Sequence, residues 1–192
     1  LVMLYVATSR SLYVWTGIVP FLALAFLAYT MIGHVQLRVD NWLNPWADPY
    51  DRSYQMVQSI FSLASGGVFG AGLGLGHPTY IPEVHTDYVF AAIGEEMGFA
   101  GALLVGSLYL IFVMRGYQIA LRTRDGFLQL VAVGLTTIIG LQALIIVAGI
   151  VRLVPLTGIT LPFVSYGGSS LLVNFIILGL LLQVSASNRR GT

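Results

Sequence analysis

The sequence predicts an all-α fold, a polytopic membrane helical bundle with one long extracytoplasmic loop. Of its 192 residues, 57% are hydrophobic and only 9% are charged, whereas an average soluble domain carries roughly 25% charged residues. Four apolar stretches reach the length of about 20 residues that a helix needs to cross hydrocarbon. Composition and segment length therefore both indicate an integral membrane protein.

The predicted spans cover about residues 12–33, 88–114, 127–151 and 168–186, within a single membrane domain of residues 1–192. The apolar residues before Ser9 are typical of the tail of an earlier span. Because the chain begins inside an apolar run without an initiator Met, we expect it to be the C-terminal portion of a longer polytopic protein.

Two outer loops are expected, at about residues 34–87 and 152–167. In the first, Asp48-Pro49 is a good helix start, and apolar residues then recur at helical spacing as far as Gly66-Gly67. This stretch is too short and too polar to cross a membrane, so we expect an interfacial or re-entrant helix. Alternating glycines at residues 70–76 predict irregular backbone, which must be covered by protein or face water.

Positive charge sets the expected orientation, because cytoplasmic loops are rich in Lys and Arg. Arg10, the arginines of residues 115–124 and Arg189-Arg190 fall on one side of the predicted spans, taken as cytoplasmic. The nine basic residues form no stripe, so no nucleic-acid partner is expected. The absence of cysteine excludes disulfide and thiol chemistry in this chain.

Asp87 is the strongest catalytic candidate. It lies at the expected outer end of a span, where a carboxylate close to hydrocarbon is costly and therefore suggests a function. A carboxylate at such a boundary suits a general base for a hydroxyl group. The alternative is structural, because Asp at a helix start also caps the helix or complements its dipole.

Other acidic and polar residues near Asp87 are candidate substrate ligands. Glu83 and His85 alternate with Asp87, so an extended segment would place all three on one side, where they could hold a divalent cation. Whether a metal or another cofactor is needed stays open. Glu95 and Glu96 project to different faces of a helix, and the alternative role for either is a buried structural hydrogen bond or an ion pair with an arginine.

Any anionic substrate on the outer side must use Arg38, Arg52 or Arg152, backbone N–H groups, a metal, or the expected missing part of the longer protein. Rim ion pairs with aspartates are the alternative for Arg38 and Arg52. A turn of small residues before the last span could let a lipid-linked chain pass close to the backbone, or could only cap the helix. Its candidate residues are Ser165, Tyr166, Gly167, Gly168 and Ser169.

Two stretches resemble the signatures of one family. Residues 81–91 read Ile-Pro-Glu-Val-His-Thr-Asp-Tyr-Val-Phe-Ala, and Gly-Glu-Glu-Met-Gly follows at 94–98. Residues 155–170 read Pro-Leu-Thr-Gly-Ile-Thr-Leu-Pro-Phe-Val-Ser-Tyr-Gly-Gly-Ser-Ser. With Asn-Pro-Trp-Ala-Asp-Pro at 44–49 before them, these stretches resemble the SEDS family (shape, elongation, division and sporulation), which includes RodA and FtsW.

The resemblance implies a peptidoglycan glycosyltransferase that polymerises lipid II at the outer face of the bacterial cytoplasmic membrane, for cell shape or division. It implies that Asp87, next to Thr86 in the His-Thr-Asp motif, takes the proton from the acceptor sugar's 4-hydroxyl. Lipid-linked pyrophosphate would leave, and Arg52 and Arg152 are the candidates to meet its charge. The implied partners are lipid II, membrane lipid and a class B penicillin-binding protein, a transpeptidase.

Two other functions remain open for this sequence. One is a lipid II flippase, which would need charged groups along a cavity that opens to both faces of the membrane. The acids collect instead on one expected outer rim, which favours chemistry at the surface. The other is a non-catalytic scaffold for the transpeptidase. We also expect the fragment alone to be inactive.

Overall fold

The computed structural model describes residues 1–190 and the side chains of residues 1–188. No strand occurs in this described part, so the predicted all-α class is confirmed. The helices, in chain order, are α1 (Val2–Thr8), α2 (Leu12–Met31), α3 (Gly33–Leu43), η1 (Pro45–Ala47), α4 (Tyr54–Ser65), η2 (Pro78–Tyr80), α5 (Val89–Arg122), α6 (Gly126–Ile150) and α7 (Gly168–Arg190). The side chains of Arg189 and Arg190, counted above among the cytoplasmic charges, lie outside the described residues.

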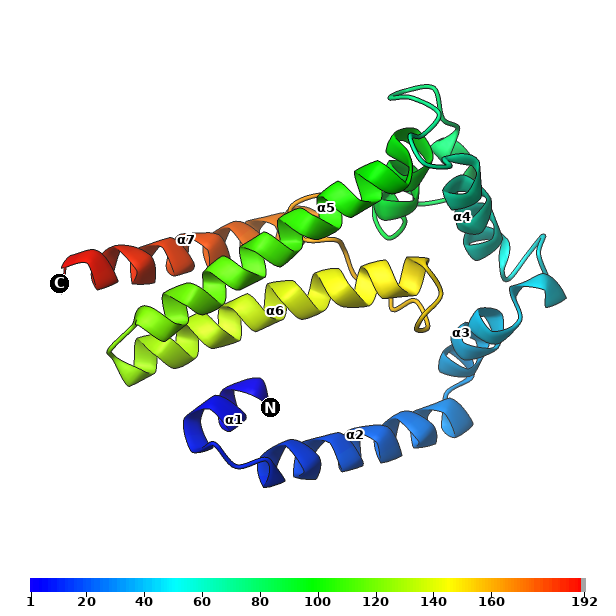
Figure 1. Cartoon of the computed structure of the whole chain (residues 1–192). Helices are drawn as coiled ribbons and strands as arrows, with labels where there is room; N and C mark the ends of the chain where they lie inside the picture. Colours follow the sequence, from blue (N-terminus) through cyan, green and yellow to red (C-terminus); the bar gives the residue numbers. More distant parts are fainter. Residues whose placement is uncertain (191–192) are drawn as a thin grey trace.

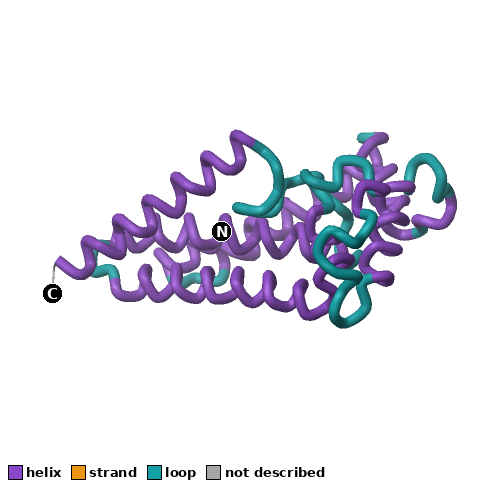
Figure 2. Tube along the Cα trace, turned by 90° about the horizontal axis from the view of Figure 1, so that it is seen from above, coloured by secondary structure: helices purple, strands orange, loops and turns teal. Residues whose placement is uncertain are grey.

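Among the described residues, four helices are long and apolar enough to cross a membrane, namely α2, α5, α6 and α7. The chain is therefore a multi-pass membrane protein. Helices α5, α6 and α7 pack against one another, while α1 contacts both α6 and α2 (Figure 1). Most of the loop chain, with α3 and α4, gathers at one end of the long helices (Figures 1 and 2). This loop end holds the Asp87 region.

Several helix bounds differ from the sequence pattern. The helix expected to start at Asp48-Pro49 starts at Tyr54 instead, because residues 48–53 fold into turns in which the Ser53 N–H donates to the Asp48 carbonyl oxygen at 3.1 Å. Residues 34–43, expected as loop, lie in α3. Helix α5 continues beyond residue 114 as far as Arg122, since long arginine side chains can extend from a helix end towards the polar boundary.

Helix α5 is broken at Gly98, whose backbone has φ 67° and ψ −167°. The glycine loop after α4 fills the break and satisfies the freed backbone groups, as irregular backbone at membrane depth requires. Four backbone hydrogen bonds of 2.9 to 3.0 Å connect the loop to α5. In α5, the N–H groups of Phe99 and Ala100 donate to the carbonyl oxygens of Gly67 and Val68. In the loop, the N–H groups of Ala71 and Gly72 donate to the carbonyl oxygens of Glu95 and Glu96.

A buried apolar cluster fixes the loop end to the long helices. It contains residues from the loop before α5, the first turn of α5, the second half of α6 and the loop before α7. Its members are Ile81, Tyr88, Phe90, Ala91, Ala143, Ile146, Ile150 and Leu161. Because Tyr88 belongs to this cluster, the neighbouring Asp87 is held where packed core meets the polar surface.

Candidate active site

Asp87 lines a polar cavity of about 150 Å³ at the loop end of the molecule. The residue immediately precedes the N-cap of α5, and its side chain is half-buried. The cavity draws its lining from α3, from the start of α4 and its approach, and from the segment after α6. The lining residues are Arg38, Asn41, Arg52, Gln55, Met56, Asp87, Tyr88, Leu156 and Gly158.

Arg38 and Asp87 both lie against Gly158. A Cβ atom at Gly158 would stand 3.4 Å from Arg38 Nη2 and 3.4 Å from Asp87 Oδ2. Gly158 has a φ of 70°, a conformation that favours glycine. Arg38 Nη1 donates to the Thr157 carbonyl oxygen at 2.9 Å, which fixes the guanidinium beside this turn. A carboxylate and a guanidinium therefore face one small polar space.

The phenol of Tyr88 is affected by the charges of both Asp87 and Arg38. The pKa of Tyr88 is raised to about 12, chiefly by burial and also by the Asp87 carboxylate, while the Arg38 guanidinium acts to lower this pKa. The phenol is therefore neutral at physiological pH. It forms an uncharged wall of the cavity beside the carboxylate of Asp87.

Arg52 supplies a second positive charge to this cavity. Its side chain is 64% exposed and makes one long ion pair, 4.0 Å from Nε to Asp48 Oδ2. Its carbonyl oxygen accepts a hydrogen bond of 2.9 Å from the Asn41 side chain, so the backbone is fixed while the guanidinium stays exposed. An exposed guanidinium beside a second one suits an anionic ligand such as a phosphate.

Arg152 does not line the Asp87 cavity. Its Nη2 donates to the Trp42 carbonyl oxygen at 2.9 Å. The structure therefore separates Arg152 from Arg52, although the sequence suggested the same role for both.

The residues just before Asp87 form turns. The Thr86 N–H and hydroxyl both donate to the Glu83 carbonyl oxygen, at 3.0 and 2.8 Å. His85 Nε2 lies 3.7 Å from Glu83 Oε2, with both side chains exposed. Within residues 1–188, no three His, Cys, Asp or Glu side chains converge as metal ligands. Glu83 and His85 thus form an exposed pair separate from the carboxylate of Asp87.

The turn before α7 packs on this loop. The Tyr166 N–H donates to the His85 carbonyl oxygen at 2.8 Å, and the two rings meet edge to face with centroids 5.8 Å apart. Ser165 is buried, and its Oγ accepts the Leu161 N–H at 2.8 Å, so it stabilises the turn. The following Gly167, Gly168 and Ser169 are partly or fully exposed where α7 begins.

Glu95 and Glu96 lie at the glycine loop. Glu95 is buried, with Ser62 Oγ donating to its Oε2 at 2.7 Å and the His77 N–H to its Oε1 at 2.8 Å. Glu96 is half-buried, and its carbonyl oxygen accepts the Gly72 N–H. Neither lines the Asp87 cavity. The side-chain contacts of Glu95 are those of the structural alternative considered above, whereas Glu96 contributes only its backbone carbonyl oxygen.

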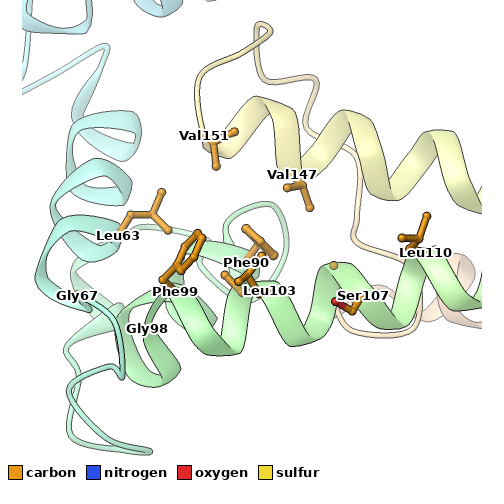
Figure 3. Close-up of a pocket in the computed structure, with 13 residues that line it drawn as sticks. Leu63, Gly67, Phe90, Gly98, Phe99, Leu103, Ser107, Leu110, Val147 and Val151 are labelled. Atoms are coloured by element: carbon orange, nitrogen blue, oxygen red, sulfur yellow. The ribbon is translucent and has the colours of Figure 1, made fainter.

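An apolar groove of about 660 Å³ lies between α4, α5 and α6 (Figure 3). Leu63, Phe99, Leu103 and Val147 point into it, and Ser107 contributes the single hydroxyl group of its lining. Phe90, three residues after Asp87, also belongs to its wall. The groove therefore begins close in sequence to the polar cavity and extends along the membrane-spanning helices.

A family model covering FtsW, RodA and SpoVE, described as "Cell cycle protein", matches residues 1–190. The chain belongs to this family. RodA of Mycobacterium tuberculosis, a peptidoglycan glycosyltransferase, is 48% identical over 190 residues, covering 99% of this chain and 40% of the relative. A probable peptidoglycan glycosyltransferase FtsW of Geobacter sp. is 38% identical, covering 98% of this chain and 52% of the relative. The chain thus spans about half or less of these proteins.

A solved structure supports the fold of this family member. It describes the structural coordination of polymerization and crosslinking by a peptidoglycan synthase complex. One of its chains superposes with a TM-score of 0.75 at 28% identity, covering 97% of this chain and 52% of that chain. The bundle and its loop end are therefore a shared architecture.

The sequence indicated Arg38 as one of three arginines that could meet an anionic substrate, with a rim ion pair as the alternative, but it did not single out Gly158, Asn41 or Gln55 as site residues. The position of Gly158 in a Pro-Leu-Thr-Gly turn was a signal that this backbone needs a special conformation. No local signal connects that turn with Arg38, which lies more than a hundred residues earlier in the chain.

Proposed function

We propose that this chain carries the outer catalytic face of a peptidoglycan glycosyltransferase that polymerises lipid II at the bacterial cytoplasmic membrane. The observation that carries the proposal is the cavity in which the Asp87 carboxylate shares a small space with the guanidinium groups of Arg38 and Arg52. Support also comes from family relatives that are named peptidoglycan glycosyltransferases.

In the proposed reaction, Asp87 accepts the proton of the acceptor sugar's 4-hydroxyl while that oxygen forms a bond to the donor's anomeric carbon. The bond between this carbon and the phosphate oxygen breaks, and the electron pair stays on the lipid-linked pyrophosphate. Arg38 and Arg52 meet the negative charge that develops there.

The lipid part of the substrate has a matching surface. We assign the polyprenyl chain to the apolar groove of Figure 3, because its wall of aliphatic and aromatic side chains offers almost no polar group. A groove of about 660 Å³ can cover part of such a chain. The polar cavity then receives the pyrophosphate and the sugars.

The partner we propose is a class B penicillin-binding protein, which would crosslink the new glycan strands. The structural relative supports this, since it comes from a complex that couples polymerization and crosslinking. The polymerase would extend a strand beside the enzyme that crosslinks it.

The deciding experiment incubates the full-length protein and its partner with purified lipid II and measures polymer length. Asp87→Asn and Asp87→Ala are expected to lower the rate at least about 100-fold, because a positioned general base contributes about 10²–10⁴-fold. Asp51→Asn, an exposed aspartate outside the cavity, is the matched control.

Polymerisation retained in Asp87→Asn would refute the base role. If the wild-type protein makes no polymer but moves lipid II across vesicle membranes, the flippase alternative replaces the proposal.

A further inference from the structure

Arg152 and Trp42 exchange two hydrogen bonds across a long sequence separation. Arg152 Nη2 donates to the Trp42 carbonyl oxygen, and Trp42 Nε1 donates to the Arg152 carbonyl oxygen, each at 2.9 Å. Both residues are half-buried. Trp42 lies in the last turn of α3, and Arg152 follows the end of α6. The pair therefore fastens α3 to the segment after α6.

Arg152 adopts a backbone conformation that arginine disfavours. Its φ is 63°, in the left-handed region where glycine is the favoured residue. Such strained residues persist where the surrounding structure holds them in place. Here the Arg152 N–H donates to the Gly149 carbonyl oxygen at 3.1 Å and the Leu153 N–H to the Ala148 carbonyl oxygen at 2.7 Å, which closes the end of α6, and the two hydrogen bonds to Trp42 add to this hold.

The same helix carries Arg38 into the Asp87 cavity. Arg38 and Trp42 are four residues apart and so lie on one face of α3. No residue of α3 is buried, and the helix packs mainly on α2 and η1. Its hydrogen bonds to the segment after α6 run from Arg38 to the Thr157 and Leu156 carbonyl oxygens and between Trp42 and Arg152. The position of the Arg38 guanidinium relative to Asp87 thus depends on this attachment.

We propose that Arg152 is a positioning residue. Acting through Trp42, it holds α3 so that Arg38 faces the Asp87 cavity, and it makes no contact with the pyrophosphate itself. The kinetic test of this inference assumes the proposed function. The structural test depends only on the geometry.

The kinetic test compares Arg152→Ala and Arg152→Gly in the full-length protein with its partner. Both substitutions remove the guanidinium. Alanine at this position is still strained by the positive φ, whereas glycine adopts that φ without strain. Both are expected to lower kcat about tenfold or more, because small displacements of a catalytic group are costly. The KM for lipid II should change less than about threefold, since no ground-state contact is lost. Arg124→Ala, an exposed arginine in the α5–α6 turn, is the matched control.

A double variant separates positioning from direct contact. Trp42→Phe keeps an aromatic ring and removes the N–H donor, so it should lower kcat in the same direction as Arg152→Gly. Residues that act as one unit are non-additive, so the double variant should be no slower than the slower single variant. A large rise in KM for Arg152→Gly, or additive losses in the double variant, would overturn the inference.

A structural test needs no activity. Amide hydrogen exchange of residues 33–43 and 151–158 should be faster in Arg152→Gly and Trp42→Phe than in wild type. Unchanged exchange in both segments would overturn the inference. If the wild type proves to make no polymer, the proposed function fails, and this exchange result still decides whether Arg152 fixes α3.

Discussion

At the scale of single residues, Glu95 shows how an acid in an apolar segment can serve the fold. The side chain is 7% exposed and accepts hydrogen bonds from the Ser62 hydroxyl and the His77 N–H. These donors belong to α4 and to the end of the glycine loop. The carboxylate therefore joins three segments, and its loss would leave the buried Ser62 hydroxyl and the part-buried His77 N–H without this acceptor.

We predict that Glu95→Ala lowers the free energy of unfolding by about 3 kcal/mol, because hydrogen bonds to a charged group contribute about 1.5–3 kcal/mol each. Glu95→Gln keeps one amide oxygen and should lose about half as much. Denaturant unfolding of the purified full-length protein in detergent measures both. Glu96→Gln is the control, since the Glu96 side chain accepts no hydrogen bond within the described residues. Wild-type stability in Glu95→Ala would contradict this role.

At the scale of elements, the break in α5 depends on a single glycine. Gly98 combines a φ of 67° with close contact to the loop after α4, where a Cβ would stand 2.3 Å from Gly70 N and 2.6 Å from Val68 O. The contacting atoms are backbone atoms and cannot rotate away. The loop and the break are therefore one structural unit.

Gly98→Ala is expected to destabilise the protein by at least about 2 kcal/mol, from steric overlap and from strain at positive φ. Gly106→Ala is the matched control on the same helix, because nothing lies within 4 Å of its Cβ position. It should be neutral, or stabilising by up to about 1 kcal/mol through helix propensity. Thermal unfolding of the two variants side by side checks the difference, and equal melting temperatures would show that the break tolerates a side chain.

At the scale of the whole molecule, polar loops gather at one end of the long helices and the α5–α6 turn lies at the other (Figures 1 and 2). The arginines of that turn predict that it faces the cytoplasm. The Asp87 cavity must then open outside, as the proposed polymerisation of lipid II requires.

Cysteine labelling in intact cells tests this orientation, since the chain contains no cysteine of its own. In a cysteine-free full-length background, Tyr50→Cys should react with a membrane-impermeant maleimide, because Tyr50 is 91% exposed at the loop end. Arg124→Cys should react only after permeabilisation. The reverse pattern would place Asp87 on the cytosolic side and exclude the proposed reaction.

The sequence by itself determined the membrane-helical class, the four apolar spans, the irregular glycine loop and the family signatures around Asp87. These follow from hydrophobic length and residue type, which are local properties of the chain. The helix α3 and the break at Gly98 escaped such reasoning, because hydrogen bonds to distant segments hold them: α3 bonds to the segment after α6, and the break bonds to the glycine loop.

Only the tertiary structure decided which side chains meet. Arg38 faces the Asp87 cavity through a turn at Gly158, Arg152 bonds to Trp42, and Glu95 bonds to the loop rather than lining the cavity. These contacts join residues far apart in sequence and depend on backbone conformations at positive φ. Residue type alone does not specify these backbone conformations. It also does not specify the contacts, since several partners could satisfy the hydrogen bonds of the same charged group.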